Sequence, residues 1–202
     1  MKMSALDRVL LLVTVLLSAY QIVVGIDALS TAPIIAYTIA FGVLLVAGLL
    51  LIILGFEVLD TPIVVIVSTV IPLALALGLV WEHLASFQTW YLIFAIIGFA
   101  AVIFTRSASV QGRLPTITTA IVHGVAGLTI FLLPIFLSIQ GVVNPAFALV
   151  GVGGALIGIC GLLLSFLKAG KPILSREIIL RIFPGLLMLM TIFFVTGFKY
   201  GG

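Results

Sequence analysis

The feature that most constrains this chain is its division into seven apolar stretches with few polar residues between them. The stretches cover residues 10–26, 33–56, 62–81, 90–104, 115–139, 145–167 and 178–198. A helix rises 1.5 Å per residue, so about 20 residues cross the hydrocarbon core of a bilayer. Long unbroken apolar runs lack the alternation of a membrane barrel, and helices satisfy their own backbone in lipid. The sequence therefore predicts an all-α polytopic membrane protein with seven transmembrane helices.

Composition argues against an additional soluble domain. Apolar residues make up 64% of the chain and charged residues 7%, whereas soluble domains carry about 25% charged residues. The longest polar connection, residues 105–114, is too short to fold independently. We therefore expect residues 1–202 to form a single transmembrane domain. The one cysteine, Cys160, allows neither an internal disulfide nor a multi-cysteine metal site, and we predict no metal ligands.

The distribution of basic residues predicts the orientation. With seven spans, the connections at one face of the membrane carry Lys2, Arg8, Arg106, Arg113, Lys168, Lys171 and Arg176, while the other face carries Lys199. By the positive-inside rule, the N-terminus is cytoplasmic and the C-terminus lies outside. We expect these cations to contact lipid headgroups of a prokaryotic cytoplasmic membrane. They form no cluster dense enough to predict binding of nucleic acid.

Two pairs of prolines indicate an internal repeat. Pro33 and Pro145 open the second and sixth stretches, Pro72 and Pro184 lie inside the third and seventh, and both pairs are 112 residues apart. These matches predict parallel repeats over residues 7–84 and 115–198, with residues 85–106 as a connecting helix. This three-plus-one-plus-three plan resembles the layout of SWEET-type sugar transporters. The Pro-Gln dipeptide that marks that superfamily is absent, so the resemblance concerns architecture and implies nothing about substrate.

Small residues predict where helices pack closely. The sixth stretch repeats small residues at spacings of three and four. The fifth stretch has a similar, shorter stripe, and it is our first choice for the helix that packs against the sixth. The first stripe comprises Gly151, Gly154, Gly158, Gly161 and Ser165, and the second Ala120, Gly124 and Gly127. Such stripes let helix backbones approach one another in lipid, within one chain or between subunits. An alternative is that the glycines leave space for a lipid, pigment or substrate.

His123 is a candidate intramembrane polar site, because an ionisable group in hydrocarbon needs a hydrogen-bond partner or a function. Thr119, four residues earlier, could help to satisfy a neutral imidazole. The stretch 121–134, with a His-Gly pair followed by an apolar run and Pro134, is similar to the haem-ligating helices of b561-type cytochromes. That resemblance implies haem ligation by His123. The alternatives are proton or substrate handling and a packing histidine, and we otherwise predict no cofactor.

Two further groups of residues lie at the predicted interfaces between membrane and water. Glu177 and Arg181 are four residues apart at the start of the seventh stretch, in the order of a stabilising helical pair. Arg181 can also extend toward lipid headgroups. At the opposite face, an aromatic belt is predicted at headgroup level. Its residues are Trp81, His83, Trp90 and Tyr91, and a docking surface for an extramembrane partner is the alternative.

Two hypotheses for function remain open. The first, which the sequence favours, is a non-catalytic integral subunit of a larger respiratory or photosynthetic membrane complex, or of a homo-oligomer. The second is a small transporter or channel for a small or apolar solute. An enzyme is the weakest hypothesis, because the chain has no glycine-rich phosphate loop, nucleophile elbow or HExxH motif. We therefore predict no catalytic residues.

Overall fold

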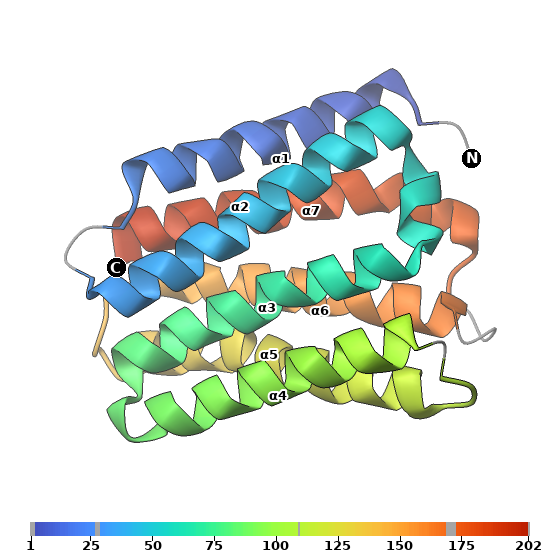
Figure 1. The fold of residues 1–202 in the computed structure, drawn as a ribbon. Helices are drawn as coiled ribbons and strands as arrows, with labels where there is room; N and C mark the ends of the chain where they lie inside the picture. The colour runs from blue at the N-terminus through green and yellow to red at the C-terminus, as the bar shows by residue number, and fades with distance from the viewer. Residues whose placement is uncertain (1–2, 27–28, 109, 169–172, 202) are drawn as a thin grey trace.

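The protein is a bundle of seven membrane-spanning α-helices, seen in a computed structural model that describes residues 3–26, 29–108, 110–168 and 173–201 (Figure 1). Within these residues there is no strand, and the prediction of an all-α integral membrane protein is confirmed. The long helices are α1 (Ala5–Val24), α2 (Thr31–Leu54), α3 (Pro62–His83), α4 (Gln88–Ser107), α5 (Leu114–Ile139), α6 (Ala148–Lys168) and α7 (Arg176–Gly201). Short 3-10 helices are η1 (Phe56–Asp60), η2 (Ala85–Phe87) and η3 (Pro145–Phe147).

Successive helices run in opposite directions, so the two ends of the chain lie at opposite ends of the bundle (Figure 1). We call the end with the start of α1, η1 and the α4–α5 and α6–α7 connections the basic end, and the end with η2 and η3 the far end. Lys2 and Lys171 lie outside the described residues, as does the side chain of Lys168. The orientation in the membrane stays a prediction, because both orientations bury the same apolar surface.

Helix α1 begins at Ala5, before its apolar stretch, because a capping box forms there. The Ser4 hydroxyl accepts a hydrogen bond from the Asp7 amide at 3.1 Å, and the Asp7 carboxylate accepts one from the Ser4 amide at 2.8 Å. Two amides that the first turn would leave unpaired are thereby satisfied. The buried Asp7 carboxylate also lies at the positive end of the helix dipole.

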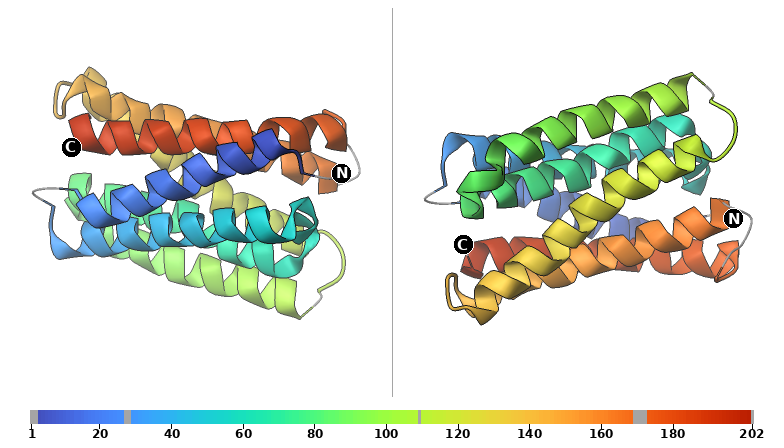
Figure 2. Two further views of the ribbon diagram at one scale, coloured as in Figure 1. Left: turned by 90° about the horizontal axis from the view of Figure 1, so that it is seen from above. Right: turned by 90° about the horizontal axis from the view of Figure 1, so that it is seen from below.

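Six helices form a closed ring, and α4 packs outside it. Around the ring each helix contacts the next in the order α1, α2, α3, α5, α6, α7 and back to α1, while α4 contacts α3 and α5 (Figure 2). Exchanging helices α1–α3 with α5–α7 maps this order onto itself. A ring of six helices has that property with or without sequence duplication, so the repeat stays a prediction.

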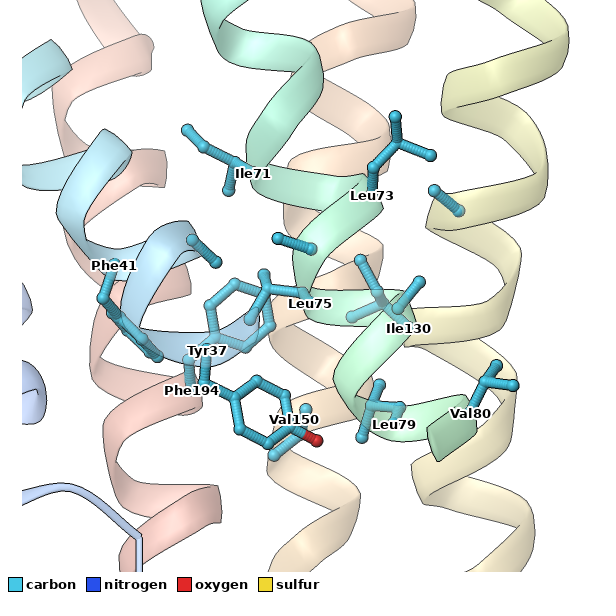
Figure 3. Packing of buried hydrophobic residues seen from close by; sticks show 14 of the residues in the cluster. Tyr37, Phe41, Ile71, Leu73, Leu75, Leu79, Val80, Ile130, Val150 and Phe194 are labelled. Carbon is cyan, nitrogen blue, oxygen red and sulfur yellow. The ribbon is translucent and has the colours of Figure 1, made fainter. Parts of the chain in front are cut away.

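Helix α3 occupies the centre of the main hydrophobic core. Its residues 71–76 are all buried, and six consecutive residues point to every side of a helix, so α3 is enclosed there. Tyr37 and Phe41 from α2, Ile130 from α5 and Phe194 from α7 belong to the surrounding cluster (Figure 3). Toward the basic end, residues 64–68 are all half-buried. The packing around α3 is therefore close in the far half and open in the basic half.

The predicted orientation can be tested with single cysteines in a Cys160→Ser background. Ala5→Cys and Tyr200→Cys place thiols at exposed positions on opposite ends of the bundle. We expect a membrane-impermeant maleimide to label Tyr200→Cys on intact cells and Ala5→Cys only after lysis. The reverse pattern would show that the N-terminus lies outside.

Candidate functional site

The glycine stripe of α6 makes a backbone contact with α5 in its first half. A Cβ atom added at Gly151 would lie 2.6 Å from the carbonyl oxygen of Phe131, and one at Gly154 would lie 2.9 Å from the carbonyl carbon of Ile130. Real Cβ atoms do not approach other atoms so closely, so neither position accommodates a side chain. The absence of a Cβ therefore lets α6 lie directly on the α5 backbone at the far end.

The second half of the stripe has no such contact. Apart from chain neighbours and the backbone of the same helix, no described atom lies within 4 Å of a Cβ position at Gly158 or Gly161, nor at Gly124 or Gly127 on α5. Ala120 is exposed, and the side chain of Ser165 lies outside the described part of the chain. Helix α6 packs on α5, the helix predicted as its partner, but it meets the bulky residues Ile130, Phe131 and Ile135 there and not the small residues of the α5 stripe. Contact of these open positions with another subunit stays a prediction.

The glycines of α5, α6 and α7 thus differ between the two ends of the bundle. Gly153 and Gly197 are as tightly enclosed as Gly151 and Gly154, whereas Gly185, nearer the basic end, has open space around it. Helices α5 and α6 lie together near η3 and separate toward the basic end (Figure 2). Gly124 and Gly158 are exposed, and we call the separation of the α5 and α6 backbones beside them the opening between α5 and α6.

A polar cluster joins α4 to α5 in the basic half. The Arg106 Nη2 donates to the Thr119 hydroxyl at 3.1 Å and to the Pro115 carbonyl at 3.4 Å. The Thr119 hydroxyl itself donates to the Pro115 carbonyl at 2.8 Å, and His123 Nδ1 lies 3.1 Å from the Thr119 carbonyl oxygen. We call Arg106, Thr119 and His123 the basic cluster.

Arg106 extends into the bundle instead of toward its end. A Cβ atom at Gly98 on α4 would lie 2.9 Å from Val122 Cγ2 on α5, so these two residues are level. Counting along the antiparallel helices from this contact places Arg106 level with Leu114. Its guanidinium nevertheless bonds to the Pro115 carbonyl and to the Thr119 hydroxyl, which belong to residues one and five positions deeper than Leu114 on α5. A membrane arginine near a helix end usually extends outward to headgroups, so the inward direction of Arg106 is unusual.

The hydrogen bond of His123 determines which ring nitrogen carries a proton. Because a carbonyl oxygen can only accept, Nδ1 must donate to Thr119, and neutral imidazole then has an unprotonated Nε2. Within the described residues Nε2 has no hydrogen-bond partner. On the helix, Gly127 follows His123 by one turn, so these two residues lie on the same face of α5.

The structure does not bring the two histidines together. Counted from the Gly98–Val122 level, His83 at the end of α3 lies about 15 Å from His123 along the helix axes. One haem iron cannot bind both residues at that separation. In the described part of the chain no three His, Cys, Asp or Glu side chains form a metal-binding group. Haem ligation through His123 with another ligand stays a prediction.

The remaining predicted residues lie apart from the basic cluster. Glu177 and Arg181 are both exposed, and no hydrogen bond or ion pair joins them. Trp90 is 71% exposed, as expected of a belt residue, and Trp81 and His83 are half-buried. Tyr91 points into the protein, where its hydroxyl is buried without a partner in the described chain. The His83 ring packs against Phe147 with centroids 5.3 Å apart.

An apolar groove of about 320 Å³ lies between α4 and α5 on another side of α5. It is lined by Phe94, Ile97, Gly98, Ala101, Thr118, Ile121 and Val122. Ile97 and Ile121 are more than half exposed, so the groove opens to the bilayer. Its lining is that of a lipid-facing crevice, and it is separate from the basic cluster.

Sequence reasoning missed two polar features. It assigned Arg106 only to the orientation, because residue order does not show which way a long side chain extends. It also overlooked a buried polar stripe on α1, formed by Asp7, Thr14, Ser18 and Gln21. The helical spacing of these four residues was a usable signal. Thr14 and Ser18 donate to carbonyl groups of their own helix, so this stripe is structural.

The two halves of the glycine stripe predict different effects of the same substitution. Gly154→Leu should destabilise the isolated protein by about 1–3 kcal/mol, because the side chain has no space against Ile130. Gly158→Leu enters open space and should change stability by less than about 0.5 kcal/mol. Unfolding in detergent measures both, and equal destabilisation would show that the opening is closed in the folded protein.

The acceptor role of Thr119 can be tested against its neighbour Thr118. Thr119→Val keeps the shape of the side chain but removes an oxygen that binds a charged donor, a loss of about 1.5–3 kcal/mol. Thr118→Val is a matched control, since the Thr118 hydroxyl has no hydrogen bond within the described residues. Thermal unfolding of both variants should show a larger loss for Thr119→Val. Equal stability would mean that Arg106 does not depend on this contact.

Comparisons with other proteins add no family to this description. No family model, curated protein or solved structure matches the chain. The chain is an integral membrane protein of seven helices, and any more specific function has to be argued from its own residues.

Proposed function

We propose that the protein is a small membrane carrier that admits a solute through the opening between α5 and α6. The observation that carries this proposal is the inward direction of Arg106. A charged group inside a membrane bundle is costly, and such groups generally belong to substrate or ion pathways. Arg106 and His123 are ionisable residues of the basic half, and both contact Thr119 of α5.

The difference between the two ends supports a carrier. Alternating access requires a state that is closed toward one side of the membrane and open toward the other. The far end is closed by Gly151, Gly153 and Gly154, while Gly124 and Gly158 have open space around them. If the positive-inside prediction holds, this state is open toward the cytoplasm. The predicted parallel repeat would supply the two halves that move relative to each other.

A second candidate is the integral subunit of a larger complex, and a separate observation favours it. The open glycines continue the stripe that packs α6 onto α5, so another helix could dock there with the same backbone contact. The occupant would be a transmembrane helix of a partner subunit. In that case the opening contains protein and neither water nor solute.

Cysteine accessibility distinguishes the two candidates. In the Cys160→Ser background, Gly124→Cys and Gly161→Cys place thiols beside the opening. Maleimide reacts with thiolate, which requires water, so a carrier should be labelled there by a hydrophilic maleimide from the basic side. Ile97→Cys is a matched control, because Ile97 is 63% exposed in the lipid-facing groove between α4 and α5 and should remain unlabelled.

Labelling should also respond to solute if the protein is a carrier. Purified protein in liposomes should take up at least one radiolabelled solute faster than protein-free liposomes, and that solute should slow labelling of Gly124→Cys. An unlabelled Gly124→Cys variant that co-purifies with a stoichiometric membrane partner would contradict the carrier and support the subunit.

A further inference from the structure

Small residues between larger ones form the apolar groove between α4 and α5. Gly98 and Ala101 lie three residues apart on α4, and the buried Gly98 and Val122 form the floor of the groove. Ile97 and Ile121, which are 63% and 55% exposed, form its rims. Its volume of about 320 Å³ lies at the lower end of the range of about 300–1,000 Å³ that ligand pockets have. The groove therefore has room for part of an apolar molecule.

The groove extends along the helix axes. Counted from the Gly98–Val122 contact, its residue nearest the far end, Phe94, is level with Ala126, and Thr118 is its residue nearest the basic end. The distance from Thr118 to the level of Ala126 is about 12 Å at 1.5 Å per residue. A hydrocarbon chain that lies parallel to the helices, as lipid chains do in a bilayer, fits a groove of this shape.

One polar group lies at the basic end of the groove. The Thr118 hydroxyl makes no hydrogen bond within the described residues, whereas the Thr119 hydroxyl donates to the Pro115 carbonyl at 2.8 Å. A hydroxyl in an apolar groove loses its hydration, and an acceptor on a ligand would restore the missing hydrogen bond. The groove thus combines an apolar body with one free donor.

The depth of Thr118 indicates which acceptor it would meet. Helix α5 has 26 residues and is about 39 Å long, so it exceeds the hydrocarbon core of about 30 Å. Thr118 lies about 6 Å from the first residue of α5, near the boundary between hydrocarbon and headgroups. The ester groups of a phospholipid lie at that boundary, and an ester carbonyl accepts hydrogen bonds.

The charge of the α4–α5 hairpin favours an anionic headgroup. Residues 88–139 contain no acidic residue but include Arg106 and Arg113. Arg106 donates from Nη2 to Thr119 and Pro115, so it contributes charge while this donor group is already engaged. Arg113 is exposed directly before α5 begins. Basic residues at the end of a membrane helix attract anionic lipids, and here no acidic side chain of the hairpin opposes them.

We propose that the groove binds one acyl chain of an anionic phospholipid from the leaflet at the basic end. The chain lies between Ile97 and Ile121, an ester carbonyl accepts from the Thr118 hydroxyl, and the phosphate contacts Arg113. Burial of the chain provides affinity, and Arg113 provides selectivity for the headgroup. The site is independent of the proposed carrier function, because the groove and the opening lie on different sides of α5.

Native mass spectrometry of the full chain in detergent tests the headgroup. The probes are phosphatidylglycerol and phosphatidylcholine with identical acyl chains. We expect the wild type to retain one phosphatidylglycerol at concentrations at which phosphatidylcholine is lost. Arg113→Gln should weaken this binding about fivefold, as expected for one basic residue near an anionic lipid. Arg8→Gln is the matched control, because Arg8 is exposed at the same end on α1, whose neighbours are α2 and α7.

A second pair of variants tests the groove. Ala101→Phe fills it and should weaken phosphatidylglycerol binding about tenfold or more, since it displaces methylene groups of the chain. Ala100→Phe is the matched control, because Ala100 is exposed and does not line the groove. If Ala101→Phe does not fold, Thr118→Val keeps the shape of the groove and should weaken binding about fivefold, whereas Thr116→Val at an exposed neighbouring position should not.

Three outcomes would overturn the lipid site. Equal retention of the two lipids by the wild type would show that the headgroup is not recognised. Equal losses in Arg113→Gln and Arg8→Gln would show a general attraction of anionic lipid to the basic end. Equal binding by folded Ala101→Phe and Ala100→Phe, or by Thr118→Val and Thr116→Val, would show that the lipid binds outside the groove.

Discussion

The close approach of α6 to its neighbours at the far end is the interaction on which the rest of the bundle depends. Gly151 and Gly154 admit the backbone of α5, and Gly153 on another side admits Phe194 of α7. In lipid the hydrophobic effect does not hold helices together, so such shape complementarity has to do so. Because these three glycines fix α6 at the far end, the angle between α5 and α6 determines how far they separate at the basic end.

The same geometry explains why some glycines of the α6 stripe contact α5 closely and others do not. Near the far end each glycine faces a bulky residue, such as Ile130 or Phe131, which fills the space that the missing Cβ leaves. Counting along the antiparallel helices from Gly154 brings Gly158 level with Gly127, and Gly161 level with Gly124. These glycines are level but not in contact, since no atom of a facing helix lies within 4 Å of a Cβ position at any of them. The opening is therefore a consequence of the angle at which α5 crosses α6, which the far-end contacts fix.

Polar groups inside the bundle are almost all satisfied by their own helix. Buried hydroxyl groups donate to a carbonyl one turn earlier, as in Thr14, Ser18, Thr69, Thr105 and Thr191. Such bonds add little to the contact between helices, because each helix would form them alone. The basic cluster differs, since Arg106 crosses from α4 to Thr119 on α5 and retains an unused donor. This contrast is why the proposed function rests on the basic cluster and not on the hydroxyl groups.

The sequence by itself determined the seven helices and their all-α class, since a backbone in hydrocarbon must satisfy its hydrogen bonds within each apolar stretch. It also identified His123 as an ionisable residue within a membrane span and the glycines of α6 as a stripe of small residues. Only the tertiary structure decided which glycines meet a neighbour, because contact depends on the angle at which α5 crosses α6. It likewise decided the direction of Arg106, since a flexible side chain near a helix end can extend to water or into the bundle. Residue order encodes periodicity along one helix, whereas the separation of α5 from α6 and the contact between Arg106 and Thr119 arise from the positions of several helices relative to one another.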